Sequence, residues 1–157
     1  MALKGPRVTV ETDISYTCSN AAERGVILVL STSGSGISQG DSAGIATLSA
    51  SASGTKVLGM LDNDVVSLDE TLYHRNFHKD TTKTGERCTL LVKGRRTTNK
   101  VTGTPAVGDV AYLTSNGVLT PTLSTTGGLV ATPKVGRFES ILDENGYVEV
   151  SINLPVI

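Results

Sequence analysis

The stretch GYVEVSINL, residues 146–154, alternates apolar and polar side chains at most steps. Because successive side chains of a strand point to opposite faces, this period of two predicts a half-buried β-strand. Immediately before it stands Glu144-Asn145-Gly146, and residues 134–141 form another β-like run upstream. Asn-Gly between two such runs is a strong signal for a hairpin turn, since both residues tolerate a positive φ. The C-terminal end therefore predicts an antiparallel hairpin.

A second hairpin is predicted just upstream, where residues 109–114 and 118–120 flank Asn116-Gly117. Further strands are expected at shorter apolar or alternating runs, separated by segments rich in Gly, Ser and Asp. The run from Gly25 to Leu30 is continuously apolar, which predicts a strand buried on both faces. The other expected strands cover residues 7–11, 14–18, 45–48, 56–61 and 88–92.

The composition agrees with an all-β chain of one domain. The chain has 157 residues, with 18% charged residues, 4% aromatic residues and no Trp. Val and Thr suit a pleated sheet, whereas Gly and Ser favour turns. Short strands at this spacing predict a small antiparallel β-barrel or sandwich with long loops, formed by residues 7–157. Residues 1–6 are expected to be an extended N-terminal arm.

The formal net charge of −1 argues against nucleic acid as the main partner, because a polyanion binder needs a basic field. No stretch approaches the ~20 apolar residues of a membrane helix, and the N-terminus shows no signal-peptide pattern. We therefore expect a protein made and kept in a cytosol, without a membrane partner. In that compartment Cys18 and Cys88 are expected to be buried free thiols.

The segment Gly40-Asp41-Ser42-Ala43-Gly44 matches the G-x-S-x-G pattern of serine hydrolases. A nucleophile elbow needs a buried strand before the serine and a helix after it, and the flanking sequence predicts neither. Both histidines follow Ser42, so the trypsin-like order of His, Asp and Ser is excluded. The order Ser, Asp, His remains open through Asp62 or Asp69 with His74. We interpret the segment as a turn and expect no enzyme activity.

Residues 71–87 form a polar excursion that carries both histidines and lacks a strand period. On a helix, His74 and His78 would share one face. A zinc site needs further ligands, and no spacing selects Cys88 or Asp80 as one. We therefore expect exposed or interface histidines, with no metal and no cofactor.

Charged residues are separated along the chain. A basic cluster comprises Lys93, Arg95, Arg96 and Lys100, and acidic residues gather at positions 62–70. No aromatic residues interleave with the basic cluster to stack bases. Complementary patches of this kind favour docking between protein copies or onto a neighbouring protein, although solvated surface charge is the alternative reading.

The C-terminal half resembles the decoration (cement) proteins of tailed-phage capsids. The resemblance rests on residues 105–112, 115–120, 134–138 and 146–150 and covers about residues 100–155, with fainter support from residues 56–64. In that family a Gly-Asp followed by a strand, a small loop, a Val-Gly and a strand ending in V-x-V recur in this order. The polar excursion at residues 71–87 departs from the compact family pattern.

The resemblance implies a small β-barrel-like domain, trimeric, on the outer face of an icosahedral head, assembled in the host cytoplasm. Its partners would be the major capsid protein and its own copies, and its arm would reach onto the capsid. Two alternatives stay open, another β-rich virion subunit (tail tube or head fibre) and a serine hydrolase using Ser42. The residues predicted to contact the capsid or a neighbouring copy are Leu3, Lys4, Arg7, His74, Arg75, His78, Arg95, Arg96 and Lys100.

Overall fold

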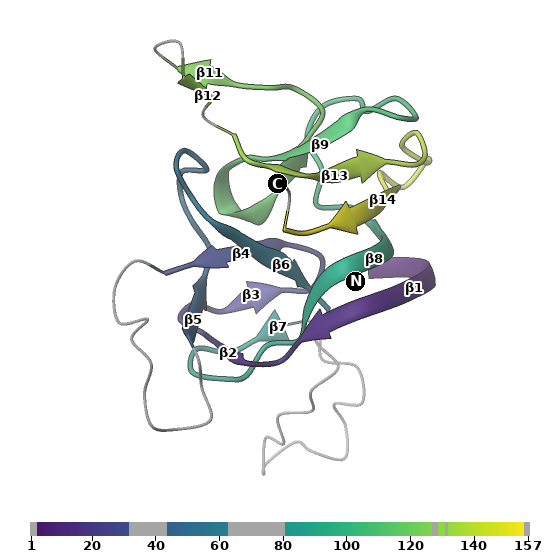
Figure 1. The fold of residues 1–157 in the computed structure, drawn as a ribbon. Coiled ribbons are helices and arrows are strands. Elements are labelled where there is room, and N and C mark those ends of the chain that lie inside the picture. The colour runs from purple at the N-terminus through teal and green to yellow at the C-terminus, as the bar shows by residue number, and fades with distance from the viewer. Residues whose placement is uncertain (1–2, 32–43, 63–80, 127–128, 131, 156–157) are drawn as a thin grey trace.

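The prediction of an all-β fold is confirmed. The structure is a computed structural model that describes residues 3–31, 44–62, 81–126, 129–130 and 132–155. Within those ranges the regular elements are strands and one short 3-10 helix (Figure 1). They are β1 (Leu3–Asp13), β2 (Tyr16–Cys18), β3 (Ala22–Glu23), β4 (Ile27–Leu30), β5 (Gly44–Thr47), β6 (Val57–Leu61), β7 (Thr81–Thr82), β8 (Leu90–Thr98), β9 (Val110–Leu113), η1 (Ser115–Gly117), β10 (Leu119–Thr120), β11 (Thr125–Thr126), β12 (Leu129–Val130), β13 (Lys134–Phe138) and β14 (Val148–Asn153).

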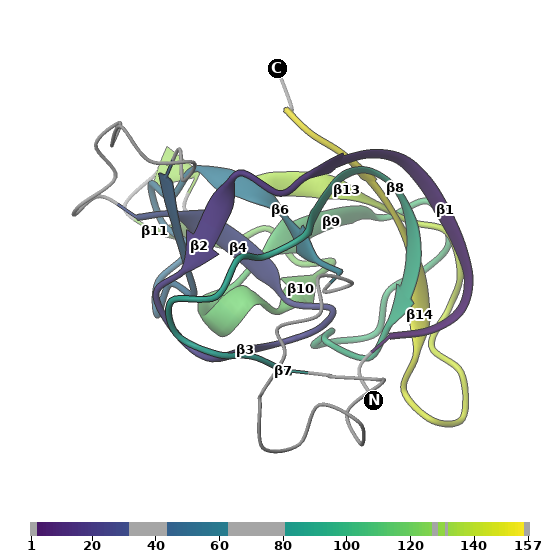
Figure 2. The ribbon, with the colours of Figure 1, turned by 90° about the horizontal axis from the view of Figure 1, so that it is seen from below.

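One ten-stranded sheet contains most of these strands, in the order β10-β9-β13-β14-β8-β6-β4-β5-β2, with β1 added on β8. All pairs in it are antiparallel except the parallel pair β2–β5. The sheet curls around its core (Figure 2), but the strand order is an open path. The expected barrel is therefore not closed.

Strand β8 joins the two halves of the sheet. Along one edge its residues 93–98 pair with β14 and its residues 90–91 pair with β6, and β1 runs along the other edge. The predicted end of this strand at Val92 is wrong, because β8 continues through the basic cluster to Thr98. Its exposed Lys93 and Arg95 alternate with buried residues, as one half-buried strand requires.

Strand β4 is buried on both faces, as its continuous apolar run predicted. Ile27 and Val29 belong to the larger core cluster, with residues of β6, β8, β9, β13 and β14. Leu28 and Val26, which precedes the strand, belong to a second cluster that includes residues of β2, β5 and β6. The strand therefore separates two cores and contributes side chains to each.

Both predicted hairpins are present. At the first, Asn116 and Gly117 have φ values of 56° and 75°, and the strands pair Leu113 with Leu119. At the second, β13 pairs with β14 from Gly136–Ile152 to Phe138–Val150, across a turn that contains Gly146.

The N-terminal boundary differs from the prediction. Strand β1 begins at Leu3, four residues before the predicted first strand, so part of the predicted arm belongs to β1. Leu3 pairs with Thr98 and Lys4 with Thr97, and the register shifts before Val8. The edge of β8 offers main-chain donors and acceptors, and pairing with them offsets the conformational entropy lost on ordering.

Candidate docking surface

Strand β1, which borders β8, carries a short apolar strip of two exposed side chains. Val8 and Val10 of β1 are 51% and 65% exposed. They line an open groove of about 300 Å³ together with Lys93, Gly94 and Arg95 of β8 and residues 151–153 of β14. Strand β8 lies between the other two strands (Figure 1). We call this groove and its rim the β1–β14 surface.

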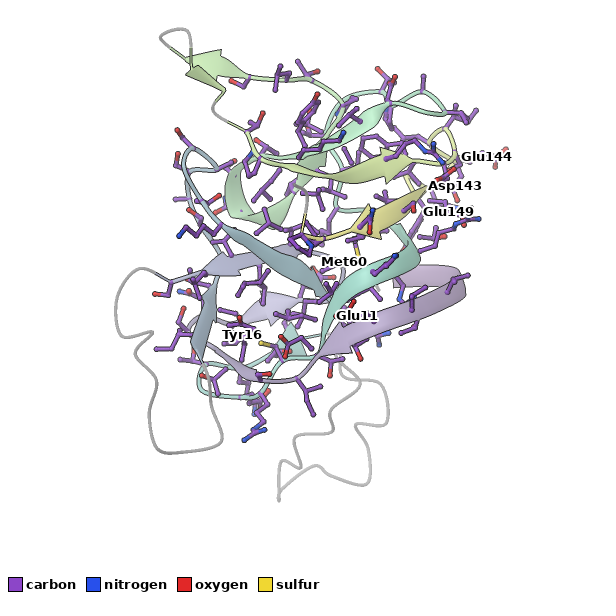
Figure 3. The ribbon with its side chains drawn as sticks, viewed as in Figure 1. Glu11, Tyr16, Met60, Asp143, Glu144 and Glu149 are labelled. Atoms are coloured by element: carbon purple, nitrogen blue, oxygen red, sulfur yellow. The ribbon has the colours of Figure 1, made fainter. Side chains whose placement is uncertain are left out.

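Charged side chains of both signs border the apolar strip. Arg95 forms an ion pair of 3.5 Å with Glu149, and Lys93 stands opposite Glu11 in the ladder. Figure 3 labels Glu149 on β14 and Glu11 on β1, on either side of β8. Arg137 of β13 is aligned with Ser151 of β14, which is itself aligned with Arg95. Because directly opposed side chains share a face, the basic row continues from β8 to β13.

Arg96, predicted as a surface contact, is buried instead, with 2% of it exposed. Its Nε and Nη2 donate to the two carboxylate oxygens of Asp62 at 3.1 and 2.5 Å. The same guanidinium donates to the carbonyl oxygen of Val8 at 3.0 Å and to Oγ1 of Thr9 at 2.7 Å. Alternation along β8 directs Arg95 outward and Arg96 inward, which composition alone does not reveal.

The buried arginine fixes the strand that carries the apolar strip. A guanidinium matches a carboxylate in a bidentate geometry, and these charge-assisted bonds are roughly twice as strong as neutral ones. Asp62 follows the end of β6, so Arg96 links β8, β6 and β1 in one network. Hydrogen bonds from the buried Arg96 therefore fix the part of β1 that carries the exposed side chains of Val8 and Val10.

Gly94 allows this close approach of β1 to β8. At its position a Cβ atom would overlap the carbonyl oxygen of Val8. Its φ of +154° also lies outside the usual range of residues with side chains. Here two steps along β1, from Thr9 to Glu11, correspond to one step along β8, from Gly94 to Lys93, which is the signature of a β-bulge.

Among the remaining predicted contact residues, the structure describes the side chain of Lys100 alone. Lys100 forms an ion pair of 2.6 Å with Glu23. The main chain at Leu3, Lys4 and Arg7 belongs to β1. His74, Arg75 and His78 lie outside the described residues, as does Ser42.

Sequence reasoning missed Val8 and Val10 as surface residues. Their spacing indicates that they share one face of a strand, but spacing does not say which face is covered. Asp62 is one of the two carboxylates considered for a hydrolase triad, and both of its carboxylate oxygens accept hydrogen bonds from Arg96. Within the described ranges, no group of three or more His, Cys, Asp or Glu side chains could hold a metal ion. The same part of the chain contains no helix long and apolar enough to cross a membrane.

Comparison with known proteins gives a likeness of fold. No family model matches the chain, and neither does any curated protein sequence. Among solved structures, the chain is similar to a chain from the capsid of Myoviridae Phage XM1, with a TM-score of 0.58 and 13% sequence identity. The similarity covers 97% of this chain and 86% of the phage chain.

Proposed function

We propose that this chain is a structural protein of a phage virion, a decoration (cement) protein that binds the outside of the capsid and stabilises the shell. The observation that carries the proposal is the likeness, over nearly the whole chain, to a chain of a phage capsid. The sequence resemblance of residues 100–155 to decoration proteins supports it from a separate direction. Under this proposal the protein acts by binding and catalyses no reaction.

The β1–β14 surface is the part we propose to dock onto the major capsid protein. Apolar side chains beside a polar rim are typical of protein interfaces. Covering an exposed pair of valines with a partner removes apolar surface from water and so favours binding. The rim charges of both signs would fix the register of docking on a partner with complementary charges. We further propose that the protein is a homotrimer on the shell, a number that rests on the family resemblance alone.

The test is binding to empty, expanded capsids of the parent phage, measured by co-sedimentation over a range of protein concentrations. We expect saturable binding by the wild type. Replacing Val8 and Val10 together by Thr keeps β-branched side chains but removes apolar area, and should weaken binding about tenfold. The matched control replaces Val107 and Ile141, which are 64% and 65% exposed outside the groove, by Thr. This control should bind like the wild type.

Three outcomes would contradict parts of the proposal. Equal binding by both double variants would exclude the β1–β14 surface as the docking site. Absence of capsid binding, together with self-assembly into tubes or fibres, would favour the alternative of a tail-tube or head-fibre subunit. Covalent labelling of Ser42 by a fluorophosphonate would favour the hydrolase.

A further inference from the structure

The two cysteines come together although 69 residues separate them in the sequence. Thr17 and Arg87 form an isolated antiparallel bridge. On either side of it the amide of Cys18 donates to the carbonyl oxygen of Glu86 at 2.8 Å, and the amide of Cys88 donates to that of Tyr16 at 3.0 Å. Cys18 therefore stands opposite Glu86, and Cys88 is its diagonal neighbour on the same face.

Both thiols are buried in the second core cluster, with Cys18 2% exposed and Cys88 fully covered. The Sγ of Cys88 lies 3.3 Å from the carbonyl oxygen of Tyr16, to which the thiol donates. A hydrogen bond between the two thiols lowers the pKa of Cys18 and raises the pKa of Cys88. Neither cysteine lines the groove of the β1–β14 surface. In Figure 3, Tyr16, which lies two residues before Cys18, is well separated from Glu149 of that surface.

We propose that Cys18 and Cys88 are a latent disulfide, kept as thiols in a reducing cytosol and joined within one chain by a small-molecule disulfide such as oxidised glutathione. The inference rests on the cysteine geometry and does not require capsid binding. If the proposed function is correct, the protein meets such oxidants when virions leave the host cell.

The reaction is two successive thiol–disulfide exchanges. The thiolate of Cys18, formed by loss of its proton, attacks one glutathione sulfur. A Cys18–glutathione bond forms, the glutathione disulfide bond breaks, and the released thiolate takes up a proton. Cys88 then loses its proton and attacks Sγ of Cys18, which forms the protein disulfide and releases the second glutathione as a thiol. Two protein thiols are oxidised and one glutathione disulfide is reduced.

Access to the buried sulfurs sets the rate. Strand β2 has three residues and ends the large sheet, so its opening exposes Cys18 at a smaller cost than global unfolding. Diagonal neighbours in a sheet are typically ~7–8 Å apart between Cα atoms, somewhat beyond the usual range of about 4.4–6.8 Å for disulfides. A small shift of the three-residue strand would close this difference.

The test uses the full chain, incubated with oxidised glutathione or with dithiothreitol, then denatured and alkylated with N-ethylmaleimide. We expect the oxidised sample to lose two hydrogen atoms in mass and to take up no alkylating group. Its thermal midpoint should rise by about 5–15 °C, since the bridge closes a long loop. Oxidation should accelerate in urea below the unfolding transition, because urea promotes opening of β2.

Cys18→Ser and Cys88→Ser are the matched variants, and under oxidation each should yield only a glutathione adduct or a dimer. The proposal is overturned if the wild type keeps two reactive thiols even in sub-denaturing urea. It is also overturned if the wild type forms only adducts or dimers, or if its bridged form has the lower thermal midpoint. Because these measurements use the free protein, their failure would leave the capsid-binding proposal intact.

Discussion

At the scale of single residues, the Arg96–Asp62 pair has the largest expected effect on stability. Replacing Asp62 by Ala leaves a buried guanidinium without its counter-ion and should lower the free energy of unfolding by about 3–5 kcal/mol. The double variant Asp62→Leu with Arg96→Met should lose less than this, because it removes both charges. Urea unfolding measures both values. The exposed neighbour Arg95, replaced by Met, is the control and should cost at most about 1 kcal/mol.

Gly94 gives a second residue-scale prediction. Gly94→Ala should destabilise the fold by about 2–4 kcal/mol, since the added methyl group collides with the main chain of Val8. The control is Gly54→Ala, where φ is +70° but no heavy atom lies within 4 Å of the added Cβ. It should cost about 1–2 kcal/mol from the backbone conformation alone. Equal losses in urea unfolding would show that β1 does not pack on Gly94.

At the scale of elements, β1 pairs with β8 at residues 3–4 and again from residue 8 onward, with a register shift between the two parts. Deleting residues 1–6 removes the Leu3–Thr98 and Lys4–Thr97 pairs and should lower the thermal midpoint by only a few degrees. Deleting residues 1–9 also takes the Val8 carbonyl and the Thr9 hydroxyl away from Arg96. That truncation should lower the midpoint far more, because buried donors lose their acceptors.

Circular dichroism melting curves compare the two truncations, and equal shifts would contradict the anchoring role of Arg96. The same variants separate two modes of capsid binding. If the chain without residues 1–6 binds capsids as well as the full chain does, the first residues are not a capsid contact, and docking runs through the β domain or the polar excursion at residues 71–87.

At the scale of the whole molecule, the sequence predicted the features that depend on local chemistry. Asn116-Gly117 and the alternation in residues 146–154 specify hairpins, because φ preferences and a period of two are local properties. The continuous run ending at Leu30 indicated burial on both faces for the same reason. These signals suffice for an all-β class, but they do not determine whether the sheet closes.

The features that sequence could not predict depend on long-range pairing. Nothing near Arg96 in sequence reveals that Asp62 and Val8 will surround it. Its place in a basic cluster therefore led to the prediction that Arg96 is exposed on the surface. Likewise, Cys18 and Cys88 become neighbours only through the bridge at Thr17 and Arg87. The exposure of Val8 and Val10 follows from which face of β1 remains uncovered, a property of the assembled sheet.

The last prediction concerns how charge contributes to docking of the whole molecule. Arg96 is buried, whereas Lys93 and Arg95 of β8 are exposed and line the groove of the β1–β14 surface. Replacing both by Gln should weaken capsid binding several-fold and make it less sensitive to salt, since rim charges act mainly through steering. Glutamine avoids placing a like charge beside Glu11 and Glu149, so the thermal midpoint should stay nearly unchanged.

The matched control replaces Lys56 and Lys134 by Gln, which changes the net charge equally. Both lysines are exposed and line a different cavity, next to Leu154 and Pro155. Capsid co-sedimentation at several salt concentrations then compares two proteins of the same charge that differ in where it was removed. A loss confined to the Lys93 and Arg95 variant would place the capsid on the β1–β14 surface, because net charge alone would weaken both variants equally. Unchanged affinity and salt dependence in that variant would mean that these two residues are solvated surface and that docking uses another face.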